Sequence, residues 1–249
     1  MTIGILALQG AFAEHGRVLD RLGLPCREVR LPADLDDLAG LIIPGGESTT
    51  IGKMLIRTGL DATIRDRVGA GTLAVWGTCA GMILLARDVG DSGSHVGAPQ
   101  PLLGLMDLRV RRNAFGTQLD SFETTLDVPD VAPHPVPAVF IRAPVVEATG
   151  PGVAVLARLP DGRAVAVREG RLLATAFHPE LTADPSFHRY FAALAALAAT
   201  PARRPLSPTD RGESTPRRPR ADPAAPLARR AARRSRRNGA TLHHTARPE

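Results

Sequence analysis

One cysteine occupies the centre of the segment Gly77-Thr78-Cys79-Ala80-Gly81, between an apolar run and a stretch of helix-forming residues. A nucleophile flanked by glycines at this spacing is typical of a sharp turn from a strand into a helix, which holds the nucleophile at a strained, exposed position. The helix dipole there favours the thiolate, the nucleophilic form of cysteine. The N–H group of Ala80 would face an oxyanion developing in the reaction. The segment therefore predicts Cys79 as a nucleophile; the alternative is a structural cysteine buried in a tight turn.

A histidine and an acid follow a second apolar run, in the segment His178-Pro179-Glu180. A cysteine nucleophile needs a base, and the base needs a group that orients it. His178 can serve as the base and Glu180 as the orienting group, while Pro179 stiffens the turn between them. The remaining histidines lack an acid at such a position: His15, His95, His134, His188, His243 and His244.

A third motif, Pro44-Gly45-Gly46-Glu47-Ser48-Thr49-Thr50, follows the apolar residues 41–43. Its two glycines let backbone N–H groups turn toward a ligand, and Ser48 is expected to cap the helix that follows. The loop lacks the Gly-Lys-Ser/Thr ending of a phosphate loop, and Lys53 is misplaced for that role. Glu47 would repel a phosphate, whereas it could bind an amino group. The alternative is an ordinary Gly-Gly turn with a helix cap.

Strand and helix signals alternate through the first 90 residues. Apolar runs bounded by turn residues predict buried strands at 2–8, 26–31, 41–43 and 73–76. Apolar residues at helical spacing predict helices at about 12–23, 48–58, 61–68 and 80–87. Such alternation favours a mostly parallel sheet with helices on both faces. Ligand sites in such sheets form beyond the carboxyl ends of the strands, where the three motifs lie.

The second half of the chain has a different pattern, with short β-like segments from Leu103 to Ala176. Asp161-Gly162 and Glu169-Gly170 are typical of hairpin turns between the last three of these segments. An Ala/Leu-rich helix is expected at about 185–199. The expected strands are 105–110, 121–127, 138–141, 153–158, 163–168 and 171–176.

The net charge of +6 is divided unevenly along the 249 residues. Residues 201–249 hold thirteen arginines against four acids, a charge of +9, so residues 1–200 carry −3. This Arg/Pro/Ala-rich tail has no aromatic residue, and we expect it to be disordered because it cannot bury enough apolar surface to offset chain entropy. The predicted domain is therefore 1–200, followed by a basic tail at 201–249.

Several classes of protein are disfavoured by composition. No apolar run approaches the roughly 20 residues that a membrane-spanning helix needs, and the first residues lack the basic start of a secretory signal. Two cysteines, Cys26 and Cys79, do not make a disulfide framework. We therefore expect a cytoplasmic protein with no membrane association.

The order Cys79, His178 and Glu180, with the Gly-Gly loop upstream, resembles the class I, triad-type glutamine amidotransferases. Five further segments add to the triad: Leu8-Gln9-Gly10-Ala11, Pro44 to Thr50, Arg112-Asn113-Ala114-Phe115-Gly116, Asp120-Ser121-Phe122-Glu123 and Phe140-Ile141-Arg142-Ala143-Pro144. With them, roughly residues 1–197 resemble more specifically the glutaminase subunit of pyridoxal 5′-phosphate synthase. The resemblance implies an α/β fold of three layers, with a mostly parallel, mixed sheet.

The resemblance also implies a reaction, in which L-glutamine is hydrolysed to glutamate and ammonia. Cys79 attacks the side-chain amide, His178 transfers the protons and Glu180 orients His178. Backbone N–H groups of Gly46 and Ala80 form the implied oxyanion hole. An arginine can pair with the α-carboxylate of glutamine and Glu47 with its α-ammonium group. The implied glutamine-binding residues are Gly46, Glu47, Ser48, Arg112, Ile141 and Arg142.

A partner is expected because free ammonia is protonated in water and lost as a nucleophile, and residues 1–200 leave no room for an acceptor site. The resemblance implies a synthase subunit, a (β/α)₈ barrel assembled as a dodecamer, with one glutaminase for each synthase subunit. It uses the ammonia with ribose 5-phosphate and glyceraldehyde 3-phosphate to make pyridoxal phosphate. No cofactor and no metal are implied for this chain. Thr117 and the basic tail depart from the family pattern.

Three alternatives remain at this point. The triad alone would also fit the glutaminase subunit of another amidotransferase, such as imidazole glycerol phosphate synthase, although the motifs at 112–116 and 140–144 favour the vitamin B6 branch. The basic tail could bind nucleic acid, but the sequence holds no recognition fold or aromatic stacking platform. The intact Cys79, His178 and Glu180 disfavour a non-catalytic binding protein.

Overall fold

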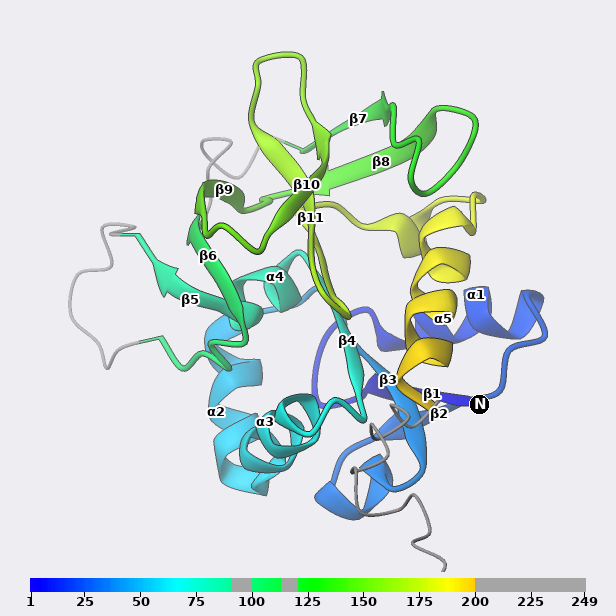
Figure 1. Cartoon of the computed structure of the whole chain (residues 1–249), viewed down its shortest axis with the longest axis vertical. Coiled ribbons are helices and arrows are strands. Elements are labelled where there is room, and N and C mark those ends of the chain that lie inside the picture. Colours follow the sequence, from blue (N-terminus) through cyan, green and yellow to red (C-terminus); the bar gives the residue numbers. More distant parts are fainter. Residues whose placement is uncertain (91–99, 113–120, 200–249) are drawn as a thin grey trace, which may run out of the picture. The chain divides into compact units, whose positions relative to one another are not determined.

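A computed structural model describes residues 1–90, 100–112 and 121–199. The predictions for segment 113–120, which includes Thr117, and for the tail at 201–249 lie outside the described residues. The described residues belong to a mixed sheet, a separate two-stranded sheet and the helices that cover them (Figure 1). The helices are α1 (Phe12–Arg21), α2 (Ser48–Thr58), α3 (Leu60–Gly69), α4 (Ala80–Leu85) and α5 (Ser186–Ala199), with 3₁₀ turns at Pro32–Leu35 and Pro179–Leu181.

The large sheet is parallel on one side and mostly antiparallel on the other, where the edge strands β5 and β6 again run parallel. Its order is β2-β1-β3-β4-β12-β11-β9-β6-β5, and β10 pairs with β11. The neighbours from β2 to β12 are parallel, whereas β12, β11, β9 and β6 are successively antiparallel. The bounds are β1 Thr2–Leu6, β2 Cys26–Val29, β3 Leu38–Ile43, β4 Ala74–Thr78, β5 Ala86–Val89, β6 Met106–Arg111, β9 Val145–Thr149, β10 Ala154–Arg158, β11 Ala164–Glu169 and β12 Leu172–Thr175.

The central parallel strands are deeply buried. Every residue of β3, β4 and β12 is buried, as expected of parallel strands covered on both faces. Figure 1 shows α1 and α5 on one side of these central strands and α2, α3 and α4 on the other. The predicted α/β fold with helices on both faces of a mostly parallel, mixed sheet is therefore confirmed.

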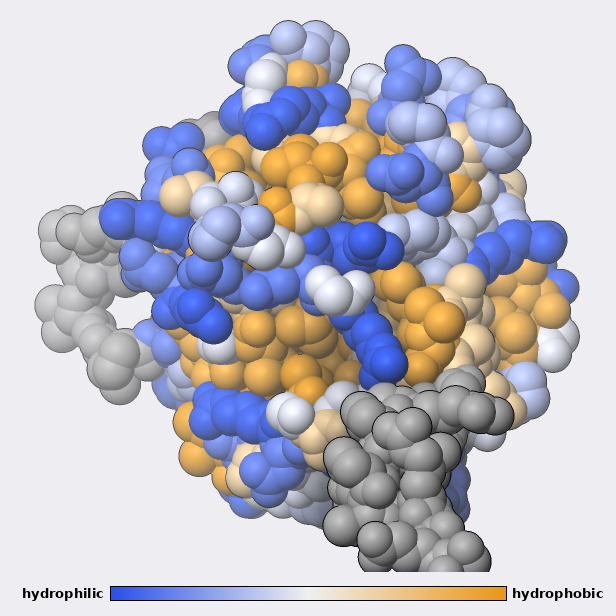
Figure 2. Space-filling view, viewed as in Figure 1, coloured by the Kyte–Doolittle hydropathy of each residue, from blue (hydrophilic) through white to orange (hydrophobic). Residues whose placement is uncertain are grey.

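The antiparallel half contains the predicted hairpins. β11 pairs antiparallel with both β10 and β12, and Gly162 and Gly170 have the positive φ angles, 87° and 59°, that such tight turns require. The strands β7 (Ser121–Leu126) and β8 (Val136–Ile141) form the separate two-stranded sheet. In the space-filling view, hydrophilic residues cover the tip of the β10–β11 hairpin and hydrophobic ones gather over the central strands and α5 (Figure 2).

Two elements differ from the sequence predictions. The helix expected at 80–87 ends at Leu85, because residues 86–89 form β5, which pairs with β6. The strand β9, just after Pro144, had no predicted counterpart. The core also holds large, fully buried aromatic side chains: Trp76, Phe140, Phe177, Phe187 and Phe191.

Candidate active site

Cys79 lies in the sharp turn between β4 and α4. Its φ of 47° and ψ of −101° are strained for a residue with a side chain, as the nucleophile pattern predicts. A methyl group at Gly77 would collide with the backbone of Gly81, and one at Gly81 with the carbonyl of Ile43. Both glycines are therefore needed for the turn to close. The predicted exposure of the cysteine was wrong, because Cys79 is only 8% exposed.

His178 and Glu180 follow β12, the parallel neighbour of β4. The His178 N–H donates to the Val139 carbonyl of β8 at 2.8 Å, which anchors the turn. The imidazole Nδ1 lies 2.7 Å from Glu180 Oε1, and both side chains are buried. Burial raises the pKa of Glu180, but nearby His15 and His178 lower it more, so the net effect is a lowered pKa. Glu180 is therefore a buried carboxylate that accepts a hydrogen bond from the His178 Nδ1–H group.

Gly45 lies beside the side chains of both Cys79 and His178. A methyl group built on Gly45 would collide with the His178 ring and come within 3.3 Å of Cys79 Cβ. The thiol Sγ lies 3.8 Å from the carbonyl of Ile141. Burial lowers the pKa of His178, but hydrogen bonding with Cys79 and Glu180 raises it to about 10. So high a pKa favours the state in which His178 has taken the proton of the Cys79 thiol, an imidazolium paired with a thiolate.

The Gly-Gly loop leads from β3 into α2, and its cap differs from the prediction. Glu47, and not Ser48, is the N-cap residue. Its Oε1 accepts from Thr49 N–H at 3.0 Å and its Oε2 from Thr50 N–H at 2.6 Å. Burial raises the pKa of Glu47, but these hydrogen bonds lower it to about 2. The Ser48 hydroxyl instead donates to Gln100 Oε1 at 3.2 Å.

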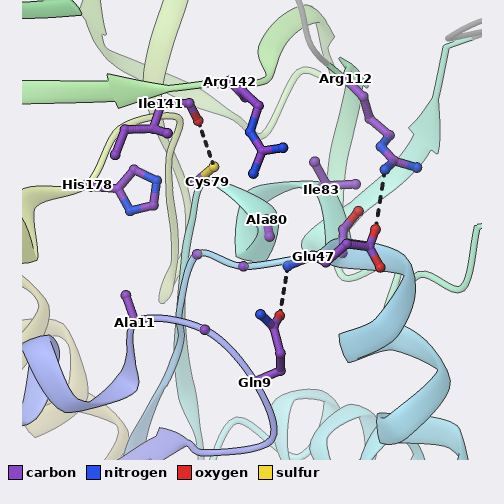
Figure 3. Close-up of a pocket in the computed structure, with 14 residues that line it drawn as sticks. Gln9, Ala11, Glu47, Cys79, Ala80, Ile83, Arg112, Ile141, Arg142 and His178 are labelled. Atoms are coloured by element: carbon purple, nitrogen blue, oxygen red, sulfur yellow. Dashed lines mark hydrogen bonds and ion pairs between the residues drawn. The ribbon is translucent and has the colours of Figure 1, made fainter. Parts of the chain in front are cut away.

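These segments surround one cavity of about 440 Å³ (Figure 3). It lies beyond the carboxyl ends of β3, β4 and β12, which are neighbours in the sheet. All the predicted site residues line it except Glu180, which is buried behind His178. The lining comprises Gln9, Gly10, Ala11, Gly45, Gly46, Glu47, Ser48, Cys79, Ala80, Ile83, Arg112, Ile141, Arg142 and His178.

Two arginines bring positive charge to the cavity. Arg112 Nη1 donates to Gln100 Oε1 at 3.0 Å, and its Nη2 lies 3.5 Å from Glu47 Oε1. Arg142, just after β8, is exposed and has a positive φ of 46°. Figure 3 shows the Arg142 guanidinium group next to Cys79 and Arg112 facing Glu47. The cavity therefore offers two cations and one anion around a nucleophile, a set of groups that suits a zwitterionic amino acid.

Comparison with known proteins identifies the family. Residues 5–196 match the SNO glutamine amidotransferase family. The chain belongs to this family. It is 57% identical over 194 residues to a protein of Herpetosiphon aurantiacus named pyridoxal 5′-phosphate synthase subunit PdxT, which covers 78% of this chain and 100% of that protein. A protein of the same name from Deinococcus radiodurans is 56% identical over 195 residues, 78% of this chain and 97% of its own.

A solved structure gives the same family relationship. It is titled "Crystal structure of glutamine amidotransferase", is 50% identical, and aligns with a TM-score of 0.72 over 78% of this chain and 98% of its own. The predicted resemblance to the amidotransferase family is therefore confirmed, and the chain is a glutamine amidotransferase.

This SNO-family chain has site residues that its sequence motifs did not assign. Gln9 Oε1 accepts from the Glu47 N–H at 2.7 Å, and Gln100 receives the hydroxyls of Ser48 and Thr49 as well as Arg112. The only sequence feature that could have assigned Gln9 to the site is its place in one of the family motifs. No neighbouring residues indicate a site role for Gln100. Within residues 1–90, 100–112 and 121–199, no group of three or more metal-binding side chains occurs. Over the same ranges, no helix has the length and hydropathy needed to cross a bilayer.

Proposed function

We propose that this chain hydrolyses L-glutamine through Cys79, His178 and Glu180 and delivers the ammonia to the synthase subunit of pyridoxal 5′-phosphate synthase. The observation that carries the proposal is the strained turn that presents Cys79 to the same cavity as the buried His178–Glu180 pair. A strained backbone persists only where the surrounding structure holds it, and such residues cluster at active sites.

The proposed reaction has two halves. The Cys79 sulfur attacks the side-chain amide carbon of glutamine while His178 accepts the thiol proton. The resulting oxyanion is stabilised by the N–H groups of Gly46 and Ala80. His178 returns the proton to the leaving nitrogen, so that ammonia departs and a thioester remains. Water, deprotonated by His178, then attacks the thioester, and glutamate and the free thiol are released.

Charge complementarity supports the proposed glutamine site. Arg112 and Arg142 are placed to pair with the α-carboxylate, and Glu47, ionised at neutral pH, with the α-ammonium group. In the free chain Arg112 contacts Glu47 and Gln100, and glutamine would replace part of these contacts with its own charges. Ser48 and Ile141 complete the proposed binding surface beside Gly46.

The ammonia acceptor is proposed to lie on a second chain. The relatives named as a subunit of pyridoxal 5′-phosphate synthase favour that enzyme over imidazole glycerol phosphate synthase. We propose one glutaminase for each subunit of a dodecameric synthase. These relatives align with about 78% of the chain, which supports a catalytic domain at 1–200 and a separate basic tail at 201–249.

The proposal is tested by measuring glutamate formed from glutamine with and without the synthase subunit, and pyridoxal phosphate by its absorbance. We expect low hydrolysis by the chain alone, a rise on addition of the synthase, and no activity for Cys79→Ala. The matched control is Cys26→Ala, which changes the other, half-buried cysteine and should leave the rate unchanged. Full activity of Cys79→Ala would refute the assigned nucleophile, and an isolated chain as active as the complex would refute the coupling.

A further inference from the structure

A buried imidazole pair lies directly behind Glu180, on the side away from His178. His15 of α1 and His188 of α5 are both 0% exposed, and the two helices lie on the same side of the sheet (Figure 1). His15 Nδ1 lies 3.0 Å from His188 Nε2. Both rings pack edge-on to Trp76 of β4, with centroid distances of 5.5 and 4.9 Å. Neither histidine has a part in the proposed chemistry, yet His15 adjoins Glu180, the residue that orients the base.

His15 contacts two parts of the candidate site through one nitrogen. Its Nε2 lies 3.5 Å from Glu180 Oε2 and 3.3 Å from the Thr78 hydroxyl. Thr78 Oγ1 in turn accepts the Gly45 N–H at 3.0 Å, at the residue before Gly46. Glu180 Oε2 is buried and has no hydrogen-bond donor among the described residues. The Nε2 atom of His15 is therefore the polar group that faces the otherwise unpartnered oxygen of Glu180.

The surroundings select one tautomer of His15. A proton on His15 Nδ1 would leave a bare lone pair at Nε2 facing the Glu180 carboxylate, and would leave the buried His188 Nδ1–H without an acceptor. With the proton on Nε2 instead, His188 Nε2–H donates to His15 Nδ1, and His15 Nε2–H points to Thr78 and Glu180. This second arrangement places a donor opposite the Glu180 carboxylate and leaves the unpartnered His188 Nδ1 as a bare acceptor, not as an N–H without an acceptor.

We propose that His15 is a positioning residue that holds Glu180 and, through Thr78, the Gly45-Gly46 loop in their working geometry, and that His188 fixes its tautomer. The inference rests on the proposed glutaminase function. It places one imidazole between the acid that orients the base and the backbone that supplies an oxyanion donor. Such outer partners keep reacting groups within the narrow geometry that catalysis needs.

The charges around the pair agree with a neutral His15. Burial lowers the pKa of His15, against the opposing effects of Glu180 and Glu14, and His178 lowers it further. Burial, His15 and Arg21 lower the pKa of His188 to about 2. His15 therefore acts on Glu180 with an N–H dipole, and does not compete with His178 for the carboxylate as a second cation. Cys79 is a further ionisable group nearby, and it interacts with His178 on the side away from His15.

The test compares His15→Leu, which removes both nitrogens, with His15→Gln, whose amide can donate to Thr78 and Glu180 and accept from His188. Glutaminase kcat, KM and their pH dependence are measured on the full chain with the synthase subunit. We expect kcat to fall about 10- to 100-fold in His15→Leu, the range for loss of a hydrogen bond near a charged group, with KM nearly unchanged. His15→Gln should recover most of this loss.

The pH profile separates positioning from a purely structural role. Loss of the His15 dipole makes Glu180 easier to protonate, so the acidic limb of kcat in His15→Leu should move to higher pH. His134→Leu is the matched control, because His134 is an exposed histidine paired with Asp184 away from the cavity. Should His15→Leu fail to fold, His188→Leu is the second variant. It leaves His15 in place but removes the imidazole that donates to His15 Nδ1, so we expect a smaller loss of kcat.

Two results would overturn the inference. One is a folded His15→Leu variant whose kcat and pH profile equal those of the unmodified chain. Where His15→Leu does not fold, a folded His188→Leu variant with unchanged kcat and pH profile has the same meaning. The other is an equal loss in the Leu and Gln variants of His15 that follows their folded fraction. An unmodified chain that forms no glutamate with the synthase present would instead refute the proposed function itself, so the two failures are distinguishable.

Discussion

Replacing Glu180 with glutamine tests the proposed role of the buried His178–Glu180 pair. The substitution keeps the size of the side chain but removes its negative charge at 2.7 Å from His178 Nδ1. The introduced amide can also donate an N–H to Nδ1, which would keep the proton on Nε2, where His178 must accept the proton of Cys79. Glu180→Gln therefore removes the charge beside His178 and also changes the tautomer of His178.

The size of the effect follows from the pKa of His178. The ordinary value is 6.5 and that of His178 is about 10, a difference of about 5 kcal/mol at 1.36 kcal/mol for each pKa unit. Cys79 and Glu180 both raise this pKa, so the loss of Glu180 removes part of this difference. We expect kcat to fall by about 10²- to 10⁴-fold, the upper end being the loss seen when the matching change in a serine protease gives the wrong tautomer.

The assay is glutamate production by the complex with the synthase, with Glu28→Gln as the control because Glu28 is an exposed acid of β2. A second readout is stability. Since the pKa of His178 is raised, its protonated form stabilises the fold fully below about pH 6.5 and this contribution is lost as the pH rises through about 10. The free energy of unfolding of Glu180→Gln should therefore fall less over this range. A kcat within about twofold of the unmodified chain would refute the reasoning.

Four further substitutions have defined outcomes. Glu47→Ala removes the two oxygens that cap α2 and should lower the free energy of unfolding by about 1 kcal/mol in chemical denaturation; it should also raise KM for glutamine, and an unchanged KM would argue against an ammonium contact. Gly81→Ala forces a methyl group against the Ile43 carbonyl and should cost about 1–3 kcal/mol. Gly69→Ala, at the end of α3 where a methyl group meets nothing, should be neutral or slightly stabilising, and equal losses at both glycines would contradict the close-packing argument. Cys79→Ala should keep the far-UV circular dichroism of the unmodified chain while it forms no glutamate.

The positions of the three motifs were predictable because each depends on local signals. A buried apolar run followed by a glycine-rich or proline-containing turn marks the end of a strand. The chain supplies this pattern before Gly45, Cys79 and His178, and β3, β4 and β12 are indeed neighbours in the sheet. The nucleophile turn was also marked locally, since the glycines at 77 and 81 are required by backbone contacts within the turn and with Ile43.

Long-range contacts account for what the sequence did not predict. His15 and His188 are 173 residues apart, so their meeting behind Glu180 required the packed helices. The cap at Glu47 was misassigned to Ser48 because both side chains can accept from the first turn of a helix. The choice between them depends on Gln100, which is distant in sequence and accepts the Ser48 hydroxyl.

The Cys79 N–H donates to the Thr175 carbonyl at 2.8 Å, three residues before His178. Nucleophile and base are thus joined through the fully buried pair β4 and β12, the kind of region that opens only when the whole domain unfolds. Destabilising changes anywhere in this sheet should therefore reduce the fraction of active molecules and leave the turnover of each folded molecule intact. In hydrogen exchange, the Cys79 amide should report the global stability of the domain.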